Sequence, residues 1–156
     1  MSGESKVKMS RRYLALVATL NKRLDHFPSH EQRALAQVIR EKMYLLCDHM
    51  VEAQKRYHKN THLNNLDIAH EQLRMHLFTA SQQLYFAHPL PKGLPEHLSK
   101  SELEGVMAKA NQERYEKLTV LVDEFGRLIG GWQKKLAKDA AQKEVEKKLK
   151  VQNSNS

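Results

Sequence analysis

The sequence predicts an all-α fold, an up-down-up-down bundle of four helices. Four apolar stripes recur at the three- and four-residue spacing of an amphipathic helix, and two short connections and one long one separate them. Only 6 glycines and 4 prolines occur in 156 residues, which favours helices throughout. No strand pattern and no internal repeat is visible. One helical domain is therefore expected.

We expect a disordered basic N-terminus over residues 1–9, the bundle over 10–138 and a Lys-rich C-terminal extension over 139–156. The first helix begins near Ser10 and ends at Pro28. Its buried stripe is Tyr13, Val17, Leu20, Leu24 and Phe27.

Residues 29–32 read as a capping box in which Ser29 caps the second helix and Gln32 reaches back to it. This helix is expected to reach about Tyr57. Its buried side carries Leu35, Val38, Ile39, Leu45, Leu46 and Met50.

A polar break over residues 58–61 separates helices two and three, with Asn60 or Thr61 as the cap. The third stripe is Leu66, Ala69, Leu73, Leu77, Ala80 and Leu84. A Pro-rich loop follows at 87–99, and Ser99 with Glu102 forms a second capping box. The last and longest stripe is Leu103, Met107, Ala110, Leu118, Val122, Phe125, Ile129, Trp132 and Leu136, after which a fraying helical extension is expected.

Residues 123–132 contain three glycines beside the only tryptophan, inside this last helix. Each glycine costs about 1 kcal/mol relative to alanine in a helix interior, so a packing reason is expected. Gly126 and Gly130 share one stripe, which suits a close helix crossing. The contact is either internal or between subunits, and the residues leave both open. We also expect Asp123 or Glu124 to pair with Arg127, either along the helix or across an interface.

The net charge of +8 is concentrated at the two ends. Residues 1–12 carry four basic side chains against Glu4, and residues 133–156 carry seven lysines against three acids. The intervening body carries only +1. Basic ends on a nearly neutral body favour a polyanion, with nucleic acid the leading candidate, and the alternative is a solubilising tail.

Nothing in the pattern builds a catalytic site or a metal centre. His58 and His62 are four apart, but the break between them argues against a shared helical face, and the paired carboxylates of a bundle-core metal site are missing. The lone Cys47 fits a reducing compartment, and no apolar run could span a bilayer. We therefore expect a soluble cytoplasmic protein that is not an enzyme and has no cofactor, with a bundle enzyme or metal carrier as the competing class.

Several of these residues resemble one known family. Phe27-Pro28, Glu31, Leu35, Ile39-Arg40, Leu73-Arg74 and above all residues 123–132 are similar to the accessory variability determinant (Avd) proteins of diversity-generating retroelements. That family overlaps with four-helix proteins encoded in intervening sequences of bacterial ribosomal RNA genes. The resemblance spans about residues 20–135.

The resemblance implies a ring-like homopentamer of bundles with a basic surface. Such a protein binds the error-prone reverse transcriptase and the template RNA, supports mutagenic cDNA synthesis and retrohoming, and catalyses nothing itself. The alternative is an intervening-sequence protein with an unknown nucleic-acid or protein partner. Phe78 and Gln32 stand where the family often has Arg, and the Pro-rich loop and Lys-rich tail exceed its pattern.

Two sets of candidate residues follow. Arg40, Arg74 and Arg127 match basic positions of the family, and clustered lysines and arginines extend the set. The candidates for nucleic-acid or partner binding are Arg40, Lys55, Arg56, Lys59, Arg74, Arg127, Lys134 and Lys135. The candidates for packing or an oligomer interface are Phe125, Gly126, Gly130, Gly131 and Trp132.

Overall fold

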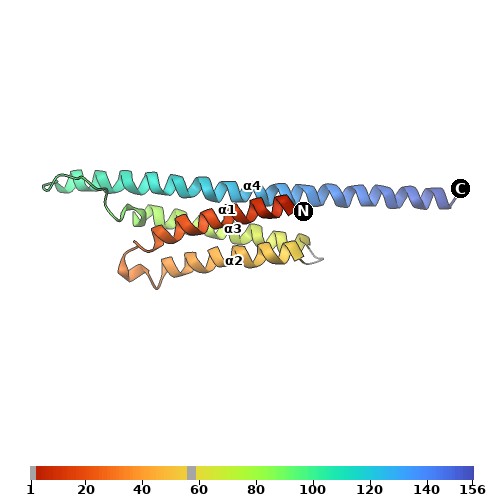
Figure 1. Ribbon diagram of the computed structural model, residues 1–156, viewed down its shortest axis with the longest axis horizontal. Helices are drawn as coiled ribbons and strands as arrows, with labels where there is room; N and C mark the ends of the chain where they lie inside the picture. Colours follow the sequence, from red (N-terminus) through yellow and green to blue (C-terminus); the bar gives the residue numbers. More distant parts are fainter. Residues whose placement is uncertain (1–2, 56–58) are drawn as a thin grey trace.

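The computed structural model describes residues 3–55 and 59–156. Within them the chain forms four α-helices, two short 3-10 turns and no strand. The elements are α1 (Gly3–Leu24), η1 (Ser29–Glu31), α2 (Leu35–Lys55), α3 (Lys59–Gln82), η2 (Tyr85–Ala87) and α4 (Lys100–Ser154). Successive helices run in opposite directions, and α1 and α3 each pack against both α2 and α4 (Figure 1). The prediction of an all-α four-helix bundle is confirmed.

The start of α1 differs from the expectation. The disorder expected over residues 1–9 is wrong for residues 3–9, which form the first turns of α1. The reason is Met9, which is only 1% exposed and extends the buried stripe of Tyr13, Leu16 and Leu20 back by one turn. Burial of the Met9 side chain stabilises this helical turn, whereas the polar residues around Met9 would not by themselves make it helical.

The corner between α1 and α2 is not the predicted capping box. Ser29 makes no side-chain cap, and α2 begins six residues later, at Leu35. Gln32 Nε2 instead donates to the carbonyl oxygens of Leu24 at 2.9 Å and Phe27 at 3.0 Å, which closes the end of α1. Glu31 Oε2 accepts from the Leu35 N–H at 3.1 Å and so caps α2. This N–H and the Tyr85 hydroxyl hold the pKa of the Glu31 carboxyl below its usual value.

The connection from α2 to α3 is only partly within the described residues. Tyr57 and His58 lie outside them. Lys59, Asn60 and Thr61 form the first turn of α3, so the expected break and cap at Asn60 or Thr61 are wrong. Leu63 is buried one turn before Leu66, and its burial draws this polar turn into the helix.

The end of α3 is shaped by a buried polar side chain on α4. Leu84 adopts a positive φ of 59° and is 38% exposed. The prediction that Leu84 belongs to the buried stripe of the third helix is therefore wrong. Phe86 of η2 is fully buried instead. Asn111 Oδ1 accepts from the Phe86 N–H at 3.0 Å, and its Nδ2 donates to the Ser81 carbonyl at 2.9 Å. These two hydrogen bonds pair backbone groups beyond the last regular hydrogen bonds of α3. A non-helical segment then runs from residue 88 to residue 99.

The last helix is the longest element and leaves the bundle. Its start is capped as predicted, with Ser99 Oγ accepting from the Glu102 N–H at 3.1 Å. The partly buried Leu136 is the last residue that packs against the core, yet α4 continues to Ser154 with every side chain from 137 onward exposed. At about 1.5 Å per residue the free part, residues 137–154, is about 27 Å long. It projects from the bundle as a single straight helix (Figure 1).

Candidate nucleic-acid interface

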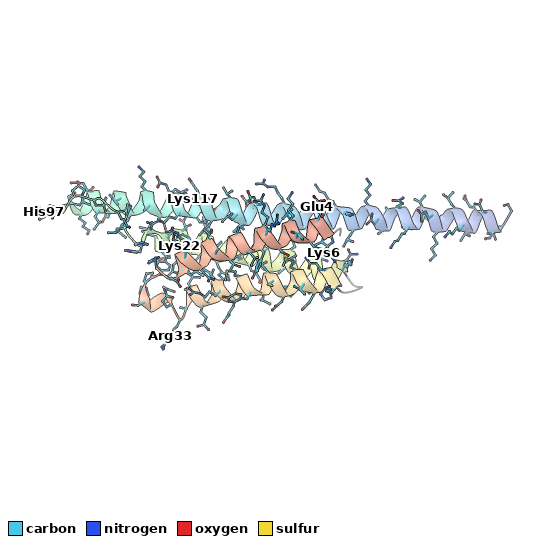
Figure 2. The ribbon with its side chains drawn as sticks, in the orientation of Figure 1. Glu4, Lys6, Lys22, Arg33, His97 and Lys117 are labelled. Atoms are coloured by element: carbon cyan, nitrogen blue, oxygen red, sulfur yellow. The ribbon has the colours of Figure 1, made fainter. Side chains whose placement is uncertain are left out.

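The two basic ends of the chain meet at one end of the bundle. The N-terminal turns of α1, the end of α2 and the start of α3 all lie where α4 leaves the bundle (Figure 1). Glu4 and Lys6 mark these first turns of α1, beside α4, and side chains project from the extension beyond them into open space (Figure 2). Charges more than 110 residues apart in sequence therefore form one surface.

A hollow of about 240 Å³ lies between α1 and α4 at this end. Its rim carries Lys8, Arg127 and Lys135, which are exposed. None of the three forms an ion pair among residues 3–55 and 59–156. Apolar side chains of Met9, Leu128 and Trp132 also line the hollow. This is a cationic rim around an apolar floor, and we call it the α1/α4 hollow.

Gly131 lines the α1/α4 hollow and has open space beside it. A Cβ built on Gly131 meets no atom within 4 Å. Trp132 is only 4% exposed, and its indole N–H has no hydrogen-bond partner among the described residues. Buried indole donors ordinarily find an acceptor. The hollow therefore combines free cations, apolar surface and open space, and the unpaired indole N–H belongs to one of its lining residues.

Two of the predicted arginines are engaged within the chain. Arg40 Nη2 lies 2.7 Å from Asp25 Oδ1. Arg74 Nη1 lies 2.7 Å from Asp123 Oδ1, and its Nε lies 3.4 Å from Glu71 Oε1. Glu71, Asp123 and Arg127 also line a second hollow of about 350 Å³ beside Arg74. Because carboxylates compete for these guanidinium groups, Arg40 and Arg74 are poorer phosphate ligands than the free cations.

The other predicted binding residues that the structure describes lie at the end of the bundle from which α4 emerges, some at the hollows and some on neighbouring helix ends. Arg127 borders both hollows, and Lys135 borders the first. Lys134 is exposed on the adjacent turn of α4. Lys55 and Lys59 lie at the same end of the bundle, at the end of α2 and the start of α3. Arg56 lies outside the described residues.

The expected pairing of Asp123 or Glu124 with Arg127 along the helix is wrong, and a pairing across an interface between copies stays a prediction. Asp123 pairs with Arg74 of α3, and Glu124 Oε2 lies 3.3 Å from Arg12 Nη1 of α1. Each carboxylate thus ties α4 to a neighbouring helix. Arg127 is left without an ion pair among the described residues, which makes it the most available of the three family-matched arginines.

The glycines of residues 123–132 do not share one role. A Cβ on Gly126 would lie 2.7 Å from Cε1 of His70, so this glycine admits a side chain of α3. His70 is buried, and its Nε2 donates to the Val122 carbonyl at 2.8 Å. Phe125 packs beside it, 6.4 Å between ring centroids. The contact at Gly126 is internal, whereas Gly130 and Gly131 have open space around them within the chain.

Residues that the sequence reasoning did not select complete this picture. Lys8 was counted only as part of a basic end, and neither His70 nor Asn111 was predicted to be a buried packing residue. In the sequence each of these residues is a polar position next to a buried stripe. That pattern does not distinguish a polar side chain that packs inside the bundle from one on the surface.

The described residues contain neither a metal-binding cluster nor a membrane-spanning helix. Among residues 3–55 and 59–156, no group of three or more His, Cys, Asp or Glu side chains is placed to hold a metal ion. His62 Nδ1 lies 2.9 Å from Glu52 Oε2, and His58 is outside the described residues. None of the helices in this part of the chain is long and apolar enough to cross a membrane.

Comparisons with known proteins give no relative. No family model, no curated protein and no solved structure matches the chain.

Proposed function

We propose that this chain is a non-catalytic accessory protein of a diversity-generating retroelement. In this role it binds the error-prone reverse transcriptase and the template RNA as a homo-oligomer and supports mutagenic cDNA synthesis and retrohoming. The observation that carries the nucleic-acid part is the convergence of both basic ends around the α1/α4 hollow. The resemblance of residues 123–132 to the accessory variability determinant proteins supports the retroelement part.

The electrostatics favour a polyanion over other partners. Lys8, Arg127 and Lys135 are free cations at the base of the extension, and residues 137–154 add five lysines on an exposed helix. A helix without tertiary contacts presents its charges at a regular spacing on several faces. That arrangement suits a phosphate backbone, which is recognised by charge rather than by sequence.

RNA affinity is expected to fall steeply with salt. About five phosphate contacts to a single strand give a slope of about −3.5 in log K against log salt, hence a roughly 100-fold loss between 50 and 200 mM salt. Fluorescence anisotropy of a labelled transcript measures this. The double variant Lys8→Gln/Lys135→Gln should reduce the slope by about 1.4.

Lys117→Gln is the matched control, because Lys117 is an exposed lysine of α4 near the opposite end of the bundle (Figure 2). Its slope should equal that of the unaltered chain. An affinity that does not change with salt contradicts the proposal.

An assembly of copies is tested at Gly130. A Cβ there meets no atom of the described chain within 4 Å, so Gly130→Leu is expected to leave helix content and thermal stability intact. If the copies approach closely at this glycine, as proposed, the larger side chain lowers the particle mass in light scattering. An unchanged oligomer mass, or a monomeric unaltered protein, contradicts this interface.

The retroelement and intervening-sequence alternatives share the fold and the charge. They differ in gene context: a reverse transcriptase gene and a near-duplicated repeat pair flank the gene in the first case, and ribosomal RNA sequence flanks it in the second. In the first case, the reverse transcriptase and the transcript should copurify with this chain.

A further inference from the structure

We infer that the α1/α4 hollow receives a single unpaired base of the bound RNA, with the flanking phosphates held by Lys8, Arg127 and Lys135. The inference deepens the proposed function and rests on it. The inference identifies an unpaired base as the part of the RNA that this surface recognises. Charge alone would not distinguish an unpaired base from a paired one.

The size and lining of the α1/α4 hollow favour a base. Its volume of about 240 Å³ lies below the roughly 300 Å³ at which pockets for drug-sized ligands begin. Its floor is the apolar surface of Met9, Leu128 and Trp132, whereas its cations are all on the rim. A nucleotide has the same division, with a flat ring at one end and an anionic group at the other. Unpaired bases commonly insert beside aromatic side chains in this way.

Two further observations point to a ligand. Gly131 leaves space where any other residue would place a Cβ, although the glycine costs helix stability and no described atom needs that space. The buried indole N–H of Trp132 lacks an acceptor among the described residues. The carbonyl oxygens of a nucleobase are acceptors of the kind that this donor lacks, and one would reach it when the side chains that cover the N–H move aside.

The surroundings also favour an open strand over a duplex. The rim cations come from two different helices, Lys8 from α1 and Arg127 and Lys135 from α4, so phosphates on either side of one base can be held at once. A paired base is not available to enter a hollow between helices, because its edges and faces are occupied by its partner and its neighbours.

The only tryptophan of the chain lines the hollow, so its own fluorescence reports on occupancy. The full chain is titrated with a ten-nucleotide oligouridylate, with an RNA duplex of ten base pairs and with uridine monophosphate. The oligouridylate is expected to change Trp132 emission on binding, and the duplex is expected to bind without that change. Equal affinity for uridine monophosphate and the oligouridylate would assign the hollow to a free nucleotide and overturn the inference.

Gly131→Leu fills the hollow and leaves all three cations in place. It is expected to weaken oligouridylate binding by roughly 10-fold, the scale of one stacked base, and to leave duplex affinity and the salt slope unchanged. Gly105→Leu, at an exposed and open glycine of the same helix, is the control and should change none of these. Gly131→Ala, a smaller intrusion that adds helix propensity, should weaken the same contact less.

The outcomes separate the two proposals. Oligouridylate binding by Gly131→Leu that equals the unaltered chain, or binding of the unaltered chain with no change in Trp132 emission, overturns the base pocket while RNA binding stands. Failure of the unaltered chain to bind any of the RNAs at low salt overturns the proposed function itself.

Discussion

Asn111→Leu is expected to lower the free energy of unfolding by about 2–4 kcal/mol, because it leaves one buried N–H unpaired at about 1–3 kcal/mol and removes a second hydrogen bond worth about 1 kcal/mol. The Phe86 N–H would lose its acceptor, whereas the Ser81 carbonyl would lose the Asn111 amide but keep the Leu84 N–H as a donor. Leucine has the same branched arrangement of side-chain heavy atoms and is larger than asparagine, so the substitution opens no cavity and the main loss is in hydrogen bonding. Urea unfolding followed by circular dichroism measures it.

Gln112→Leu is the matched control for Asn111→Leu. Gln112 is exposed on the same turn and bonds only Glu116 within α4, so its replacement should change stability by less than about 0.5 kcal/mol. A similar small change for Asn111→Leu would show that this amide does not hold η2 against α4.

Gly126→Ala is expected to destabilise the fold by up to about 2 kcal/mol, the cost of overpacking less the helix propensity gained. The new Cβ would lie 2.7 Å from Cε1 of His70. The ring must shift, which weakens its hydrogen bond to the Val122 carbonyl.

Gly105→Ala is the matched change in open space on the same helix, and it should stabilise by about 1 kcal/mol. The sign of the effect therefore reverses between two glycines of α4. Equal stabilisation by both substitutions would mean that His70 can move away at no cost.

The features that could be predicted from the sequence are those that depend on residues three or four positions apart in the chain. The stripe of Phe125, Ile129 and Trp132 is buried as its spacing requires. The cap at Ser99 is likewise local. At Ser29 the same local pattern failed, because the Gln32 side-chain amide donates instead to carbonyl oxygens at the end of α1, eight and five residues back.

The candidate site was less predictable because its partners are distant. Arg74 and Asp123 are 49 residues apart, and nothing near either residue reveals that their charges meet. The grouping of Lys8 with Arg127 and Lys135 likewise depends on which ends of α1 and α4 adjoin. The antiparallel order of the helices was predicted, but the register that sets these side chains opposite one another was not.

The continuity of α4 has a consequence for avidity. The helix passes from the α1/α4 hollow into the extension without a break, so the exposed lysines from Lys138 onward keep a fixed direction from that hollow. Once one part of a strand is bound at the hollow, contact with these lysines becomes an intramolecular step. Its effective concentration is then set by a continuous helix that holds these lysines within about 27 Å of the bundle, and no flexible tether has to be ordered first.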